Sequence, residues 1–152
     1  MLTQDNKIDL KFVVMGDPIG KSRPRFTRTG RVYTPAKSAE YEKRVMQAAW
    51  SGMKRLKIDP TAKSVHVDLI AYLPIPKSWT KKKKNEALVG ALRPNKPDLD
   101  NILKAVLDGC NEVVYLDDKQ VHSIRARKMY QTYDKFPSIE VCVSWTYDQS
   151  GP

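Results

Sequence analysis

The stretch from Lys96 to Val121 most constrains the fold, because it combines a helical apolar pattern with a concentration of acidic residues. From Asp98 onward, its apolar side chains recur every three or four residues, at Leu99, Ile102, Leu103, Val106, Leu107 and Cys110. That spacing places them on one face of an α-helix, which packs against the rest of the chain. We therefore predict a helix here, with Asp98 or Asp100 capping its first turn.

The opposite face of this predicted helix is charged. Asp100, Lys104 and Asp108 follow one another at intervals of one turn, so two carboxylates and one ammonium group share a column of side chains. A capping aspartate is common, and an ion pair of this spacing contributes only about 0.3–0.5 kcal/mol to helix stability. A structural role therefore accounts for each of these residues taken alone.

The acidic residues as a group need a further explanation. The stretch holds six of them in a protein with a formal net charge of +10: Asp98, Asp100, Asp108, Glu112, Asp117 and Asp118. If the chain reverses after the helix, as a helix followed by a strand does, its two pairs of aspartates can meet. Carboxylates that meet repel one another unless a cation lies between them. Ligands that are all oxygen favour a hard ion such as Mg²⁺.

RusA-type Holliday junction resolvases carry a similar run of residues. It reads KPDLDNILK at 96–104, with Asp108 one turn further on and LDDKQV at 116–121. Weaker similarity extends over most of the chain, including the Gly-x-Pro-x-x-Lys-x-Arg-x-Arg segment that begins at Gly16. Proteins of this family are small endodeoxyribonucleases that are common in prophages, so the resemblance implies a nuclease that acts in DNA recombination and repair.

The resemblance also implies roles for individual residues. Asp98, Asp100 and Asp118 are expected to bind Mg²⁺, with Mn²⁺ as an alternative ion and Asp117 as a further candidate ligand. Lys104 is expected to be an essential catalytic lysine. A homodimer is implied as well, and it suits a four-way junction, because a two-fold protein presents two equivalent sites to two strands of like sequence. The expected reaction is resolution of Holliday junctions by paired nicking of DNA phosphodiester bonds.

The excess of positive charge points to a polyanionic partner. The chain has 27 Lys and Arg residues against 17 Asp and Glu residues. A membrane surface is the competing polyanion, but the sequence has no basic amphipathic helix or lipidation motif, so we expect DNA instead. We predict that DNA is bound by Lys21, Arg23, Arg25, Arg28, Arg125 and Arg127.

Most of these cations belong to the segment 16–33, where Arg31, Phe26 and Tyr33 also lie. Arginines contact phosphates, and aromatic side chains stack on exposed bases. A solvated hairpin whose charges only add solubility is the alternative. The start of this segment resembles a nucleotide-binding P-loop, but it has three residues between its glycines instead of four, and Pro24 prevents the helix that should follow. We therefore expect no nucleotide cofactor.

Other residue types exclude further classes of protein. The chain has only two histidines, which argues against zinc enzymes and histidine-based triads. Cys110 and Cys142 lie on apolar faces without metal-binding spacing, so we expect free thiols. No apolar run approaches the roughly 20 residues of a membrane span, and the first residues lack a signal-peptide core. We expect a cytoplasmic protein with no membrane partner.

Alternating apolar residues predict strands over residues 8–14, 65–73, 121–130 and 139–147, and helical spacing predicts a second main helix over 38–53. We expect the first two strands to pair. Four lysines, 81–84, precede the acidic stretch and add positive charge. The predicted fold class is α+β, with one domain over residues 1–152, a mixed sheet of about four or five strands, two main helices and a loose tail at 148–152.

Two other functions use the same residues. A general nuclease for branched or flap DNA has the same site, and only competition between substrates distinguishes it from a resolvase. A non-catalytic, basic DNA-binding module, whose acidic helix contacts another protein, shows no Mg²⁺-dependent strand scission and no particular sensitivity to Lys104. That second function leaves the paired carboxylates unexplained.

Overall fold

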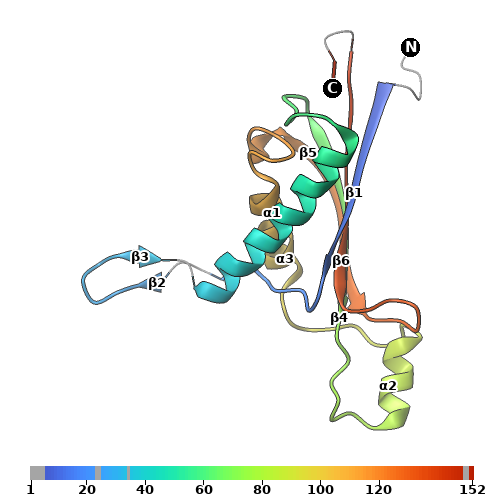
Figure 1. The fold of residues 1–152 in the computed structure, drawn as a ribbon. Helices are drawn as coiled ribbons and strands as arrows, with labels where there is room; N and C mark the ends of the chain where they lie inside the picture. The colour runs from blue at the N-terminus through green and yellow to red at the C-terminus, as the bar shows by residue number, and fades with distance from the viewer. Residues whose placement is uncertain (1–5, 23–24, 34, 149–150) are drawn as a thin grey trace.

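A computed structural model of the chain describes residues 6–22, 25–33, 35–148 and 151–152. A four-stranded sheet in the order β1-β6-β4-β5 lies at its centre (Figure 1). Its strands are β1 (Lys7–Met15), β4 (Val65–Leu73), β5 (Val121–Tyr130) and β6 (Ser138–Thr146). β6 runs antiparallel to both of its neighbours, whereas β4 and β5 are parallel. The sheet is therefore mixed, and the predicted α+β class is confirmed.

The prediction that the first two strands pair is wrong. β6 lies between them and pairs Val143 with Leu10 on β1 and with Val67 on β4. Alternation of apolar residues predicts which side chains face the core, but it carries no information about the neighbouring strand. β6 is mostly buried, as a central strand is.

Two helices, α1 (Ala36–Leu56) and α3 (Leu99–Cys110), pack on the same face of the sheet (Figure 1). Their apolar faces meet the inward side chains of all four strands. The core between these layers includes Leu10, Phe12, Val67, Leu69, Val141, Val143, Tyr41, Val45, Ile102 and Val106. The opposite face of the sheet is left without a helix among the described residues, and it carries Arg125 and Arg127.

Gly109 sets the distance between α1 and α3. A Cβ atom at this position would lie 2.5 Å from Val45 Cγ1 and 2.7 Å from Val45 Cβ. We expect Gly109→Ala to lower the free energy of unfolding by about 2–3 kcal/mol, even though alanine favours a helix by roughly 1 kcal/mol. Gly52→Ala is the matched control, because its Cβ would come closer than 3.8 Å to one atom alone, the terminal Cδ1 of Leu10 at 2.8 Å. Urea denaturation measures both, and equal losses would contradict a tight crossing at Gly109.

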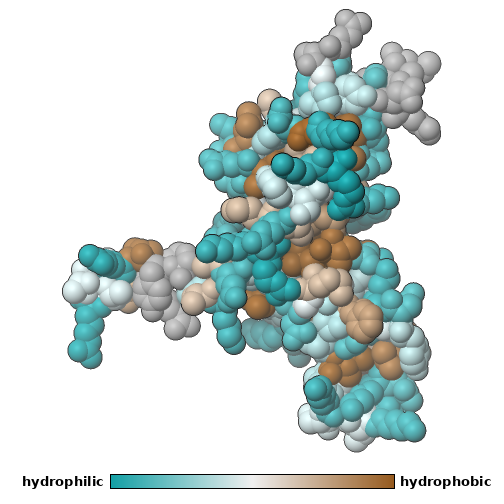
Figure 2. Space-filling model, in the orientation of Figure 1, coloured by the Kyte–Doolittle hydropathy of each residue, from teal (hydrophilic) through white to brown (hydrophobic). Residues whose placement is uncertain are grey.

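Two smaller elements extend from this body. β2 (Arg25–Phe26) and β3 (Val32–Tyr33) form a hairpin that projects away from the sheet (Figure 1), and Figure 2 shows mostly hydrophilic side chains on its tip. α2 (Lys81–Leu88) carries the four lysines, and the Thr80 side chain caps it by accepting a hydrogen bond from the Lys83 N–H. The hairpin and α2 place positive charge at the periphery of the fold.

The end of the chain is attached to the sheet rather than loose. The Pro152 carbonyl accepts hydrogen bonds from Thr61 Oγ1 at 2.8 Å and from Trp145 Nε1 at 3.1 Å. Both cysteines are free thiols, as predicted, and burial raises the pKa of Cys110 to about 12. Within the described part of the chain, no helix is long and apolar enough to span a membrane.

Candidate active site

Asp98 and Asp100 lie at the N-terminal end of α3. Asp98 is the N-cap residue, but its side chain accepts no capping hydrogen bond. Its carboxylate is 57% exposed and lies 3.9 Å from Lys96 Nζ. Asp100 Oδ1 accepts a hydrogen bond from the Asn101 N–H at 3.0 Å. The two carboxylates are therefore close in the chain at a helix end whose dipole favours negative charge.

The start of α3 is held from two sides. On one side, Lys128 of β5 donates hydrogen bonds from Nζ to the carbonyls of Asn95 at 2.7 Å and Pro97 at 3.0 Å. On the other side, the Lys21 N–H donates to the Asn101 carbonyl at 2.9 Å. The role of Lys128 was not predicted, because in the sequence it is one more cation on a strand. No local pattern indicates that it reaches a loop 31 residues away.

A cleft opens beside Asp98. It has a volume of about 310 Å³ and lies between the loop that precedes β2 and the start of α3. Gly20 packs closely here, because a Cβ at this position would lie only 3.0 Å from Asn101 Cβ and 3.2 Å from Pro97 Cβ. The residues that line the cleft are Gly20, Lys21, Ser22, Lys96, Pro97, Asp98 and Asn101.

Lys104 and Asp108 share one face of α3, as predicted. Lys104 Nζ lies 3.8 Å from Asp108 Oδ2, which is too long for a hydrogen bond. The Lys104 side chain is 62% exposed, whereas the Asp108 side chain is 21% exposed. Lys104 therefore keeps an accessible ammonium group one turn beyond Asp100.

Lys21, which we expected to contact DNA, binds two carboxylates within the chain. Its Nζ donates to Asp108 Oδ2 at 2.7 Å and to Glu42 Oε1 at 2.9 Å. Partial burial lowers the pKa of Lys21, but these two hydrogen bonds outweigh burial, and the net shift is upward. Glu42 was not predicted to take part, because its partners lie on other elements and its own helix gives no signal.

Asp117 and Asp118 lie at the turn before β5. Asp117 caps the short 3-10 helix η2 (Asp118–Gln120), and its carboxylate accepts a hydrogen bond from the Lys119 N–H at 2.9 Å. That hydrogen bond lowers the pKa of Asp117. Gln120 Oε1 in turn accepts from the Asp117 N–H at 2.9 Å. Asp117 thus has a structural role, which the Asp-x-x-Gln spacing of a capping box indicates. Both Asp117 and Asp118 are exposed.

The two acidic pairs do not meet within one chain. The first pair lies at the start of α3, which Lys128 of β5 contacts. The second pair lies at η2, which leads directly into Val121, the first residue of β5. At the usual rise of a strand, Val121 and Lys128 are about 23 Å apart. The chain does reverse after α3, but a helix of 12 residues is about 18 Å long. The reversal therefore leaves Asp117 and Asp118 near the C-terminal end of α3, away from Asp98 and Asp100 at its N-terminal end (Figure 1). Within the described ranges, no three His, Cys, Asp or Glu side chains are grouped to hold a metal ion.

The predicted DNA-binding arginines occupy two separate surfaces. Arg28 is exposed on the β2–β3 hairpin. Arg125 and Arg127 lie opposite Asp68 and Ile70 on the open face of the sheet, and Arg125 Nε donates to Asp68 Oδ1 at 2.8 Å. The hydrogen bond from Arg125 lowers the pKa of Asp68. Arg23 lies outside the described residues, and of Arg25 only the backbone is described.

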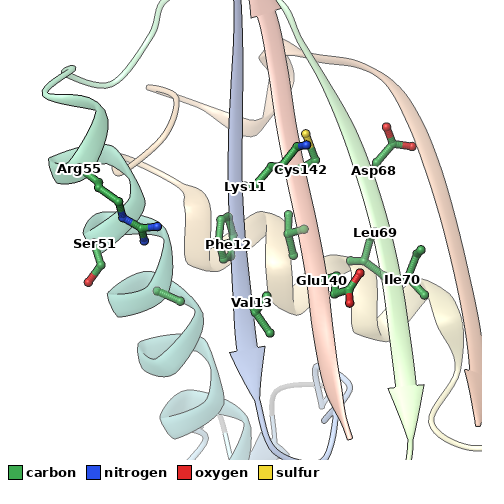
Figure 3. Close-up of a pocket in the computed structure, with 12 residues that line it drawn as sticks. Lys11, Phe12, Val13, Ser51, Arg55, Asp68, Leu69, Ile70, Glu140 and Cys142 are labelled. Carbon is green, nitrogen blue, oxygen red and sulfur yellow. The ribbon is translucent and has the colours of Figure 1, made fainter. Parts of the chain in front are cut away.

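A larger hollow lies elsewhere. It has a volume of about 680 Å³ and is lined by α1, β1, β4 and β6 (Figure 3). Lys11, Arg55, Asp68 and Glu140 contribute charges of both signs to it. None of the predicted catalytic or metal-binding residues lines this hollow. Asp98 lines the smaller cleft, so we place the candidate site there.

Two comparisons with known proteins cover nearly the whole fold. The family model described as Endodeoxyribonuclease RusA matches residues 15–144, from the end of β1 to β6. A relative from Bacillus subtilis (strain 168), which bears the name "Uncharacterized protein YqaN", is 38% identical over 140 residues, which are 88% of this chain and 94% of that protein. The matched range includes both ends of α3 and η2. The chain therefore belongs to the RusA family of endodeoxyribonucleases.

Proposed function

We propose that this nuclease is a Mg²⁺-dependent Holliday junction resolvase, which hydrolyses one phosphodiester bond in each of two opposed strands. The observation that carries the proposal is the arrangement at the start of α3. Asp98 and Asp100 lie two residues apart there, and the exposed ammonium of Lys104 lies one turn further on. The net charge of +10 supports a polyanionic substrate for the same site.

The carboxylates suit a hard cation. Asp98 and Asp100 offer only oxygen donors, and Mg²⁺ typically takes one or two carboxylates and keeps several waters. Asp98 and Asp100 would hold the ion, which would supply activation of water for attack at phosphorus. Lys104 would neutralise negative charge that develops on the phosphoryl oxygens, since its ammonium is not in a hydrogen bond with Asp108.

Asp118 completes this ligand set only if it comes from a second protomer. It lies at the opposite end of α3 from Asp98 and Asp100 in the same chain. In a two-fold homodimer, the start of α3 of one protomer can face the η2 turn of the other. The symmetry would repeat this arrangement and so create two equivalent sites. We therefore include a homodimer with two shared sites in the proposed function.

Affinity for the junction would come from the arginines on the periphery. We expect Arg28→Ala to weaken junction binding and to reduce the salt slope, d log K/d log[salt], by about one, because each phosphate contact releases roughly one counterion. Binding titrations over a series of KCl concentrations measure this slope. Lys7→Ala is the matched control, since Lys7 is paired with Asp9 at the N-terminal end of β1. An unchanged slope in Arg28→Ala would exclude a phosphate contact.

The proposed activity is tested with a synthetic four-way junction, a linear duplex and a flap, each with Mg²⁺ and with chelator. Paired, symmetric and Mg²⁺-dependent nicks on the junction are the expected result. Equal cutting of the flap would show that the protein is a general branched-DNA endonuclease and not a resolvase. Binding without nicking in both Mg²⁺ and Mn²⁺ would indicate a DNA-binding module instead.

A further inference from the structure

Four charged side chains meet where α1, α3 and the loop before β2 come together. Lys21 Nζ is the shared donor to Glu42 Oε1 and Asp108 Oδ2. Lys104 Nζ lies 3.8 Å from the same oxygen of Asp108. Each of the three hydrogen-bonded side chains is only about one-fifth exposed, at 19%, 20% and 21%. The cluster holds two carboxylates and two ammonium groups, of which Lys21 donates hydrogen bonds, whereas Lys104 forms only a longer ion pair.

Backbone contacts fix Lys21 in this place. Its N–H donates to the Asn101 carbonyl on α3 at 2.9 Å, and the next N–H, that of Ser22, donates to the buried Ser38 Oγ at 3.2 Å. The loop is therefore attached to both helices on either side of the Lys21 side chain. A side chain in this position points into the body of the protein, which differs from the direction needed to reach a phosphate on a bound DNA strand.

The charges explain what Lys21 does for its neighbours. Glu42 and Asp108 bind the same nitrogen, so their carboxylates are close together, and like charges in a partly buried site repel strongly unless a cation compensates them. Without Lys21, the cation left beside Asp108 is Lys104, which already forms an i, i+4 ion pair with it at 3.8 Å. Lys104 would then be drawn closer to Asp108, within hydrogen-bonding distance.

We propose that Lys21 is a positioning residue, which donates hydrogen bonds to Asp108 and Glu42 and so keeps the ammonium of Lys104 out of hydrogen-bonding distance of Asp108 and accessible for phosphoryl transfer. The inference rests on the proposed function in one respect, because it takes Lys104 as the catalytic lysine. It assigns Lys21 a role in turnover rather than in DNA affinity, contrary to what its position in a basic segment predicts.

The first test is Lys21→Met, which keeps the length of the side chain and removes its charge. We expect turnover of a four-way junction to fall by about 10–100-fold, while the Kd for the junction changes by less than about threefold. Lys7→Met is the control, because it removes the same charge from an exposed ion pair and is expected to leave both constants unchanged. Weaker binding with unchanged turnover would overturn the proposal and make Lys21 a DNA contact.

A second substitution separates positioning from a loss of folding. In Lys21→Met/Asp108→Asn, the carboxylate that would capture Lys104 is neutral, so we expect turnover to return to within about threefold of the wild type. A residue that only holds the loop in place would not be rescued by removing its own partner. Failure of this double variant to regain turnover would overturn the proposal, even if Lys21→Met alone does not fold.

The state of Lys104 can also be read without DNA. A limiting amount of an amine-acetylating reagent, followed by mass spectrometry of the peptide that contains Lys104, reports how accessible its ammonium is. We expect slower acetylation of Lys104 in Lys21→Met and wild-type acetylation in the double variant. Unchanged acetylation in Lys21→Met would overturn the inference about Lys21. Absence of cleavage by the wild type would instead contradict the proposed function, and the two failures are therefore distinguishable.

Discussion

Asp100→Asn is expected to abolish cleavage of a four-way junction, with a loss of at least about 1,000-fold in single-turnover rate. Asparagine has nearly the same shape, and its side-chain oxygen can still accept the hydrogen bond from the Asn101 N–H, so the start of α3 is preserved. What is lost is the negative charge and one oxygen donor. A metal site with few carboxylates depends strongly on both.

Binding of the junction should survive this change. The carboxylate adds no affinity for a polyanion, so the Kd is expected to stay within about threefold of the wild type or to fall slightly. Asp59→Asn is the matched control, since Asp59 is an exposed carboxylate in the turn after α1 and lies outside the proposed site. Cleavage by Asp100→Asn at the wild-type rate would remove Asp100 from the site. Equal loss of cleavage in Asp59→Asn would show that net charge, not position, is responsible.

Lys104→Ala is expected to lower the single-turnover rate by about 100–1,000-fold, which is the usual effect of removing one group that stabilises charge in the transition state. Lys104 is 62% exposed and Asp108 keeps its hydrogen bond from Lys21, so folding should be unaffected. Loss of one exposed cation among 27 Lys and Arg residues should change the Kd by only a few-fold.

Measurement of both constants distinguishes the possible roles of Lys104. A fall in rate with little change in Kd supports a catalytic lysine. Equal losses of rate and affinity would show that Lys104 is a phosphate contact in the ground state, because an interaction made equally in both states does not accelerate the chemical step. Lys104→Arg keeps the charge but changes its shape, so we expect it to recover only part of the rate.

The sequence predicts α3 and the faces of the strands well, because these depend on local spacing. The apolar residues from Leu99 to Cys110 repeat along one stripe, and Ile102 and Val106 are fully buried where that stripe meets the core. The pairing of the first two strands was predicted incorrectly for a physical reason. Whether β1 pairs with β4 or β6 depends on packing between segments far apart in the chain, which no local pattern contains.

The site was predicted only in part. The position of Asp98, Asp100 and Lys104 follows from the helix alone, whereas the place of Asp118 depends on how the chain returns after α3. The prediction that the acidic pairs meet assumed a reversal but did not include the length of the helix. Lys21 was assigned to DNA because its neighbours in the chain are basic, and its partners Glu42 and Asp108 become visible only in three dimensions.

Mixed dimers test most directly whether Asp98, Asp100 and Asp118 serve one metal site. One protomer carries Asp100→Asn and the other carries Asp118→Asn, each with its own affinity tag, and the mixed dimer is purified with both tags. Each variant alone is expected to be inactive as a homodimer. In the mixed dimer, a site shared between protomers is intact once, because the unchanged Asp98 and Asp100 of one chain join the unchanged Asp118 of the other.

We therefore predict that the mixed dimer nicks the four-way junction in one strand only, at roughly half the wild-type rate, and that chelator removes this activity. Absence of nicking by the mixed dimer, beside a wild-type dimer that cuts both strands, would contradict a site built from both protomers.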